Sequence, residues 1–241
     1  MKAIKFKILA GLLFLASMAF SANLTTADGV PVPDSILLTE NNHVLLRGEV
    51  SEESIAKAIK DFSRILTKRK QASSHLYLVL DTPGGSVTDG YRLYEFLKSY
   101  PNIHTITLTS YSMGAVLVEL IDGQRLIVST GTLMFHRMRA TIPSYYTTEQ
   151  LQSRTRYYES LEQFAKDRIT ERVGISMAEL DKLLNEELWL TGKQAIDRKY
   201  ADKIVSIKCD EVLLKKKETQ IIQPLPFLPP MEVEVSACPL L

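Results

Sequence analysis

The sequence lacks the features of fibrous, disordered or nucleic-acid-binding proteins. Its 241 residues include only 11 glycines and 10 prolines, too few for a collagen-like or low-complexity chain. The 29 basic residues nearly balance the 28 acidic ones, so no excess of positive charge indicates a phosphate backbone as a partner. We therefore expect no nucleic-acid partner, and the 45% of hydrophobic residues is enough to bury a globular core.

Long hydrophobic runs are also scarce, and the longest lies at the N-terminus. Three lysines precede an apolar run over residues 8–20, which ends on small residues. This run is shorter than the roughly 20 residues that a helix needs to span a bilayer. The pattern predicts a signal peptide over residues 1–21, cleaved near Ser21 and Ala22, and an exported protein that is periplasmic or secreted. We expect membrane association only if this segment is retained.

Cysteine is nearly absent, and the two that occur are Cys209 and Cys238. An even number of cysteines in an oxidising compartment permits a disulfide. Two separate thiols, one of them near the end of a buried strand, are equally consistent with the sequence. Both alternatives remain open at this point.

Composition divides the chain behind the signal peptide into three parts. Residues 22–36 are polar and contain prolines, which indicates an irregular N-terminal arm. Residues 37–209 alternate apolar strands with amphipathic helices and form the expected main domain. Residues 210–241 contain a lysine run and five of the ten prolines, which predicts an extended or flexible C-terminal tail.

The alternation of strands and helices predicts the fold class. Strands separated by helices of 10 to 15 residues are typical of right-handed βαβ units in a mainly parallel sheet, so we expect an α/β fold. Thr147 and Gln150 form a capping-box pattern that opens a helix of about 25 residues, ending before Gly174. The apolar runs that we interpret as strands are 44–46, 76–80, 103–108, 125–128, 132–135 and 204–207.

In such a sheet, functional residues are expected in the loops that follow the carboxyl ends of the strands. Of the four histidines, only His136 directly follows a strand, since the others precede one. Ser112 lies in a turn between a strand and a helix, and Gly84-Gly85 lie in another such turn. Adjacent glycines let backbone N–H groups approach a ligand. A nucleophile, a base and backbone donors at one edge of one sheet are what acyl transfer requires.

These segments resemble those of ClpP-type serine peptidases of the ClpP/crotonase superfamily. The resemblance covers roughly residues 36–206, and its fold implies repeated ββα units with a mainly parallel sheet and a long handle helix. The four matching motifs are DTPGGSV at Asp81–Val87, SMGA at Ser112–Ala115, LMFH at Leu133–His136 and LWLTG at Leu188–Gly192.

The resemblance implies roles for individual residues. Ser112 would be the nucleophile, His136 the general base, and the N–H groups of Gly85 and Met113 the oxyanion hole. Ser112 needs a base because a hydroxyl is a poor nucleophile near neutral pH. We expect Gly85 to lack a side chain because a Cβ there would narrow the oxyanion pocket.

The position of the family's catalytic aspartate falls on Glu187. A glutamate can accept a hydrogen bond from the histidine, as it does in some α/β-hydrolases. Glu186 and Asp181 are the rivals. Adjacent residues of an extended segment point to opposite faces, so Glu186 and Glu187 would not both reach His136 if this stretch is extended.

Together these features predict an exported, ATP-independent serine endopeptidase that cleaves short or unfolded peptides by acyl-enzyme chemistry. We expect no cofactor, no metal and no ATPase partner, because export removes the chain from cytoplasmic ATP and the sequence shows no nucleotide-binding loop. The long helix after Thr147 resembles the family's handle and predicts a homo-oligomeric ring. The sequence predicts neither the cleavage specificity nor the number of subunits.

Three other functions remain open. A non-catalytic ClpP-fold scaffold could bind peptides without cutting them. A membrane-associated protease similar to signal-peptide peptidase would use a Ser-Lys dyad, with a lysine such as Lys166 beside Ser112. A crotonase-type acyl-CoA enzyme is the least favoured alternative, since export removes it from its substrates.

Overall fold

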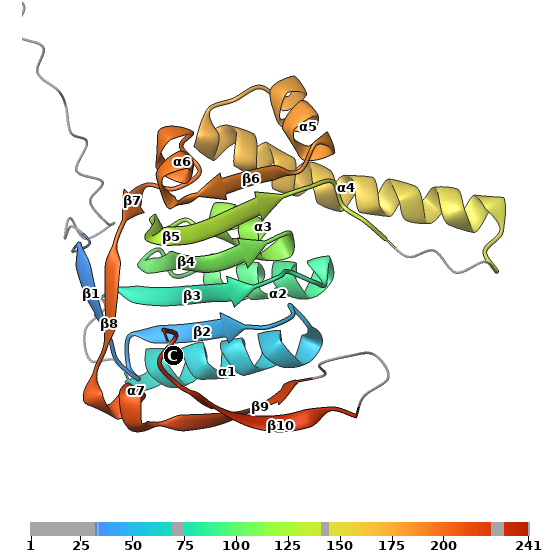
Figure 1. Cartoon of the computed structure of the whole chain (residues 1–241). Helices are drawn as coiled ribbons and strands as arrows, with labels where there is room; N and C mark the ends of the chain where they lie inside the picture. Colours follow the sequence, from blue (N-terminus) through green and yellow to red (C-terminus); the bar gives the residue numbers. More distant parts are fainter. Residues whose placement is uncertain (1–31, 33, 69–74, 141–144, 223–228, 241) are drawn as a thin grey trace, which may run out of the picture.

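The computed structural model describes residues 32, 34–68, 75–140, 145–222 and 229–240, and a six-stranded sheet forms its centre (Figure 1). The strand order is β2-β3-β4-β5-β6, and β7 pairs with β5. Strands β2 to β5 are parallel, whereas β6 is antiparallel to β5, which confirms the mainly parallel α/β fold. The strands span His43–Arg47 (β2), Leu76–Thr82 (β3), Ile103–Tyr111 (β4), Arg125–Phe135 (β5), Leu188–Thr191 (β6) and Lys203–Ile204 (β7).

Strand β5 corrects one expectation from the sequence. The two short strands expected at 125–128 and 132–135 form one continuous strand. Its pairing with β4 shifts register between Thr107 and Thr109, near Gly131. A Cβ at Gly131 would lie 2.8 Å from the Thr107 carbonyl oxygen, so the glycine permits close approach at an irregularity within one strand.

Three helices cover one face of the sheet (Figure 1). They are α1 (Glu52–Lys68), α2 (Val87–Leu97) and α3 (Met113–Leu120). In α1 the helical spacing of apolar residues places Ile55, Phe62 and Ile65 in the core.

Helix α3 is anchored at its far end by buried charges. Glu119 is fully buried and accepts a hydrogen bond of 2.8 Å from Arg125 at the start of β5. Arg125 also contacts Asp202 at 2.6 Å. Burial raises the pKa of Glu119 to about 7, against the opposing charges of Arg125 and Arg172. Moving α3 away from the sheet would separate these partners and leave an uncompensated buried charge, which is costly. The network therefore holds α3 against the sheet.

The other face of the sheet carries a smaller layer. Strand β1 (Ser35–Leu38) pairs in parallel with β8 (Ser206–Cys209), and the short helix α7 (Glu211–Lys215) follows. Strand β1 begins inside the arm expected to be irregular up to residue 36, and the single closing strand expected at 204–207 is divided between β7 and β8. Both strands of this small sheet contribute apolar residues to a second core cluster with β3 and β4.

The described residues of the C-terminal tail include two extended strands, which pair with each other. Strands β9 (Lys217–Ile222) and β10 (Met231–Ser236) form an antiparallel pair beside α1, where Lys57 approaches Glu218 at 3.8 Å (Figure 1). The sequence of β10, MEVEVS, alternates polar and apolar residues with the period of a strand. This alternation favours a strand even though prolines are nearby.

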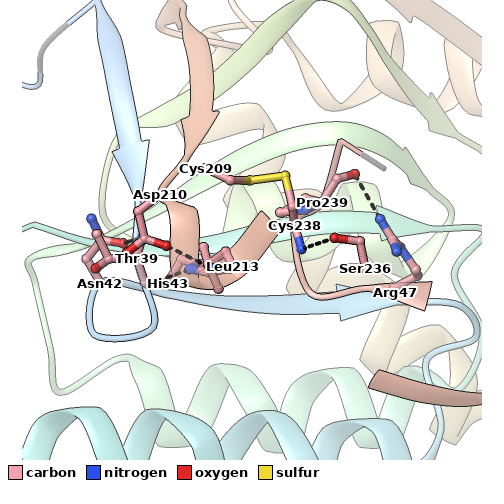
Figure 2. Close-up of a disulfide and its surroundings, with 10 residues drawn as sticks. All are labelled: Thr39, Asn42, His43, Arg47, Cys209, Asp210, Leu213, Ser236, Cys238 and Pro239. Carbon is pink, nitrogen blue, oxygen red and sulfur yellow. Dashed lines mark hydrogen bonds between the residues drawn. A yellow bond between two sulfur atoms is a disulfide. The ribbon is translucent and has the colours of Figure 1, made fainter. Parts of the chain in front are cut away.

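A disulfide between Cys209 and Cys238 attaches the chain end to the small layer (Figure 2). The Cys238 side chain is buried, and the N–H of Cys238 donates to Ser236. Arg47 at the end of β2 donates to the Pro239 carbonyl at 2.8 Å. The alternative of two separate thiols is therefore wrong.

A long helix, α4 (Thr148–Val173), extends beyond the body of the molecule (Figure 1). Thr147 and Gln150 form the expected capping box, and Gly174 ends the helix in the left-handed conformation. Only the C-terminal half contains fully buried residues, among them Ala165 and Ile169. Two short helices, α5 (Met177–Asn185) and α6 (Gly192–Asp197), lie on either side of β6 in the sequence.

No helix among the described residues is long and apolar enough to cross a bilayer. The signal peptide expected over residues 1–21 lies outside the described residues.

Candidate active site

Ser112 lies in a sharp turn between β4 and α3. Its backbone has φ 52° and ψ −119°, a conformation that a residue with a Cβ rarely adopts. The Ser112 N–H donates to the Met134 carbonyl on β5 at 2.8 Å, which ties the turn to the neighbouring strand. The hydroxyl makes no capping hydrogen bond to the helix, so it is not used as an ordinary N-cap. The turn therefore presents the hydroxyl at the carboxyl end of the sheet.

The Gly84-Gly85 turn follows β3 at the same edge. Both glycines have positive φ, 92° and 144°. The Val50 N–H donates to the Gly84 carbonyl at 2.8 Å, and the Ser86 N–H donates to the Val50 carbonyl at 2.7 Å. Within the described residues, no hydrogen bond uses the N–H of Gly85 or that of Met113. Both donors remain available for a developing oxyanion.

The structure adds a close approach at Gly85 that was not predicted from the sequence. A Cβ at Gly85 would lie 2.4 Å from the Val50 carbonyl oxygen, on the side of the chain that leads into α1. A Cβ at Gly84 would instead lie 2.7 Å from the Ser112 Cβ and 2.9 Å from the Met113 nitrogen. Gly84 therefore keeps the space beside the serine open, whereas Gly85 allows the bridge to Val50.

His136 directly follows β5, as the sequence predicts. Its Nδ1 lies 2.5 Å from the Arg137 carbonyl oxygen. Because a carbonyl oxygen only accepts, Nδ1 carries the proton, and the Nε2 of a neutral ring is left with a lone pair. This is the tautomer that a general base for a serine hydroxyl requires.

Glu187 lies just before β6 (Leu188–Thr191), near the histidine. The antiparallel register ends at the pair Phe135–Leu188, so His136 and Glu187 are the next residues beyond this end of the ladder. Glu187 has φ 59°, and its carboxylate accepts a hydrogen bond of 2.5 Å from Arg139. That hydrogen bond is the main cause that lowers the pKa of Glu187, and the charge of His136 lowers it further. In this structure the carboxylate thus pairs with Arg139, and the histidine donates to a carbonyl.

The two rival acids have other surroundings. Glu186 is exposed and forms the C-cap of α5. Asp181 on α5 binds the Lys166 ammonium at 2.5 Å and lies 3.5 Å from Arg137. Trp189, which follows the acid on β6, is 52% exposed and stacks edge-on with Tyr111, so the buried Leu188 anchors this part of the strand.

Ser112 and His136 line one cavity of about 90 Å³. One face of α4 forms the opposite wall, and Met138 and Arg139 continue from the histidine along the rim. This wall was not predicted from the sequence, although residues spaced three and four apart on one helix face were a usable signal. The lining residues from α4 are Glu162, Ala165, Lys166 and Ile169.

Lys166 lies in this cavity but is already paired. Its side chain is 9% exposed, and its ammonium donates to Asp181. A lysine that acts as a general base must present a free lone pair to the serine. The Ser-Lys alternative is therefore not supported.

Among the described residues, no group of three or more histidine, cysteine, aspartate or glutamate side chains could hold a metal ion.

The comparison with known families decides the assignment. The model of the Clp protease family matches residues 34–208, from just before β1 to β8. The chain belongs to the Clp protease family. The match includes every candidate catalytic residue and ends before the C-terminal hairpin and Cys238.

Three proteins that are similar to this chain are also Clp protease subunits, although their sequence identity to it is low. The ATP-dependent Clp protease proteolytic subunit 1 of Frankia casuarinae is 25% identical over 167 residues, which cover 68% of this chain and 77% of that protein. The ATP-dependent Clp protease proteolytic subunit 3 of Rhodococcus jostii is 24% identical over 166 residues, which cover 68% of this chain and 80% of that protein. The ATP-dependent Clp protease proteolytic subunit 1 of Streptomyces avermitilis is 27% identical over 168 residues, which cover 67% of this chain and 74% of that protein. At the level of the family, the chain is a serine-type protease.

Proposed function

We propose that this Clp family member is an exported, ATP-independent serine endopeptidase that cleaves short or unfolded peptides. One observation carries the proposal: Ser112, His136 and the two unused N–H groups of Gly85 and Met113 meet at one cavity. In the proposed reaction these groups would serve as the nucleophile, the general base and the donors to the oxyanion.

The reaction would proceed through an acyl-enzyme. The Ser112 oxygen attacks the scissile carbonyl carbon while His136 Nε2 takes the hydroxyl proton. The N–H groups of Gly85 and Met113 stabilise the oxyanion, and each such donor contributes about 2.7–4 kcal/mol where it has been measured. His136 then returns the proton to the leaving amine, and a water molecule hydrolyses the ester by the same steps in reverse order.

Glu187 is the proposed orienting acid. The β5–β6 register that brings it near His136 supports this role. In the productive arrangement the Nδ1 proton of His136 would move its hydrogen bond from the Arg137 carbonyl to the Glu187 carboxylate. Catalytic hydrogen bonds are often incomplete before substrate binds, so the present contacts are compatible with that change.

Export is supported by the signal-peptide pattern over residues 1–21 and by the disulfide. Disulfides persist in oxidising compartments and are rare in the cytosol. The similar proteins are named as ATP-dependent subunits, whereas an exported protease has no access to cytoplasmic ATP. We therefore propose substrates that need no unfolding.

A homo-oligomer is supported by helix α4. Its N-terminal half extends from the body with few buried side chains, and Tyr157 and Phe164 are 48% and 44% exposed (Figure 1). A second copy of the chain could cover these aromatic side chains.

A fluorogenic peptide assay without ATP tests the proposed function, together with a serine-reactive probe. We expect the wild-type protein to cleave the peptide and to be labelled at Ser112. Ser112→Ala and His136→Ala should lose turnover by several orders of magnitude, and Lys166→Met should retain it. A folded wild-type protein with neither labelling nor turnover would instead identify a non-catalytic scaffold. Loss of turnover in Ser112→Ala and Lys166→Met, but not in His136→Ala, would restore the dyad.

A further inference from the structure

We infer that Arg139 is a positioning residue that holds Glu187 for the triad. A glutamate has one more methylene than an aspartate, and hence one more side-chain torsion to restrain. Arg139 Nη2 binds Glu187 Oε1 at 2.5 Å, and the Trp189 side chain also forms a hydrogen bond to this carboxylate. The inference rests on the proposed function, because it assigns a role to a group beside the same acid.

The position of Arg139 in the chain suits this role. It follows His136 by three residues on the segment that leaves β5, and it lines the same cavity. Glu187 lies near that segment, just before β6. The base, the acid and the proposed anchor therefore lie on two adjacent chain segments, where a small rotation of a side chain can exchange partners.

Other cations near the cavity have other partners. Arg137 pairs with Glu162 at 3.1 Å, and Lys166 pairs with Asp181 at 2.5 Å. Within the described part of the chain, Arg139 is the only cation that forms an ion pair with Glu187.

Exposure indicates that the pair serves geometry more than stability. The side chains of Arg139 and Glu187 are 71% and 36% exposed. Ion pairs at such positions contribute little to folding, because water screens the charges. An anchored carboxylate nevertheless avoids a search among rotamers each time His136 becomes positively charged, and misplacement by about 1 Å can cost up to a hundredfold in rate.

The test measures kcat and KM for peptide cleavage in Arg139→Gln, Arg139→Lys and Glu187→Gln, and in the double variant Arg139→Gln/Glu187→Gln. We expect Arg139→Gln to lower kcat roughly tenfold with little change in KM, because a misplaced acid slows the chemical step more than it weakens substrate binding. Arg139→Lys should recover part of the loss. In the Glu187→Gln background, Arg139→Gln should have no further effect, because there is no carboxylate left to position.

Lys182→Gln is the matched control, since it removes an exposed cation from the neighbouring helix α5. It should leave kcat unchanged. Wild-type kcat in Arg139→Gln, an increased kcat, or equal losses in the two backgrounds would each overturn the inference while leaving the peptidase proposal intact. A wild-type protein with no turnover and no probe labelling would contradict the peptidase proposal, and the role of Arg139 would fall with it.

Discussion

At the scale of the residue, Ser112 combines an unfavourable backbone with a reactive side chain. Its φ of 52° and ψ of −119° are close to the first central position of a type II′ turn, which glycine favours. Residues with a Cβ in such regions carry a cost of about 1–3 kcal/mol, which persists only where the surrounding structure enforces it. Two sets of contacts hold the Ser112 backbone in this conformation. One is the hydrogen bond from the Ser112 N–H to the Met134 carbonyl, and the other is the group of buried charges that anchors α3.

Replacing the serine with glycine should therefore stabilise the protein while removing its proposed activity. We expect Ser112→Gly to raise the free energy of unfolding by about 1 kcal/mol, after about 0.5–1 kcal/mol is lost to the greater freedom of the unfolded chain. Urea unfolding measures this change. Ser112→Ala is the control, because it keeps the Cβ and should show no such gain. Equal stability of the glycine and alanine variants would show that the turn is not strained.

At the scale of the element, two histidines connect the strands at the edge remote from Ser112. His104 on β4 accepts a hydrogen bond of 2.9 Å from the Gln124 N–H at Nδ1, so its Nε2 carries the proton and donates to His75 Nδ1 at 3.0 Å. Burial is the main cause that lowers the pKa of His104 to about 4, and the charge of His75 adds to it. His104 is therefore neutral in the folded protein at pH 7.

This pair should make stability depend on pH. The unfolded chain binds a proton at His104 near pH 6.5, whereas the folded chain binds it only near pH 4. The free energy of unfolding should consequently fall by about 3 kcal/mol as the pH is lowered from 6.5 to 4, and then level off. Unfolding curves of wild type and His104→Gln across this range measure the contribution, since the other groups titrate in both proteins. Parallel pH profiles would exclude the histidine as the cause.

At the scale of the whole molecule, the disulfide joins the end of β8, in the smaller layer, to the C-terminal part of the chain. Cys209 ends β8, and Cys238 follows the hairpin, 29 residues further along the chain (Figure 2). Closing a loop of this length is expected to contribute roughly 3–4 kcal/mol to stability through the unfolded state. The chain end thereby stays attached to strand β8 and to Arg47.

Export and oxidation together predict the mass of the mature protein. Material recovered from outside the cytoplasm should begin near Ala22 and contain no free thiol, so that alkylation adds mass only after reduction. Intact-mass measurement before and after reduction determines both the first residue of the mature chain and the number of free thiols. Retention of Met1 to Ser21 would indicate a signal anchor, and two alkylated thiols without reduction would contradict the disulfide.

The order of strands and helices could be predicted from the sequence because hydrophobic period, caps and turns are local properties. They identify the strand before Ser112, the strand before His136 and the capped helix after Thr147. Because parallel strands end at one edge of a sheet, local patterns were also sufficient to bring the serine, the histidine and the glycine turn together.

The remaining features depend on contacts between segments that are distant in the sequence. Only the fold shows that a Cβ at Gly84 would meet Ser112, whereas a Cβ at Gly85 would meet Val50. Only the pairing of β5 with β6 brings Glu187 near His136 and within reach of Arg139. The disulfide partner of Cys209 was likewise determined by the hairpin that returns Cys238 to β8, since no local pattern encodes the distance between two chain segments.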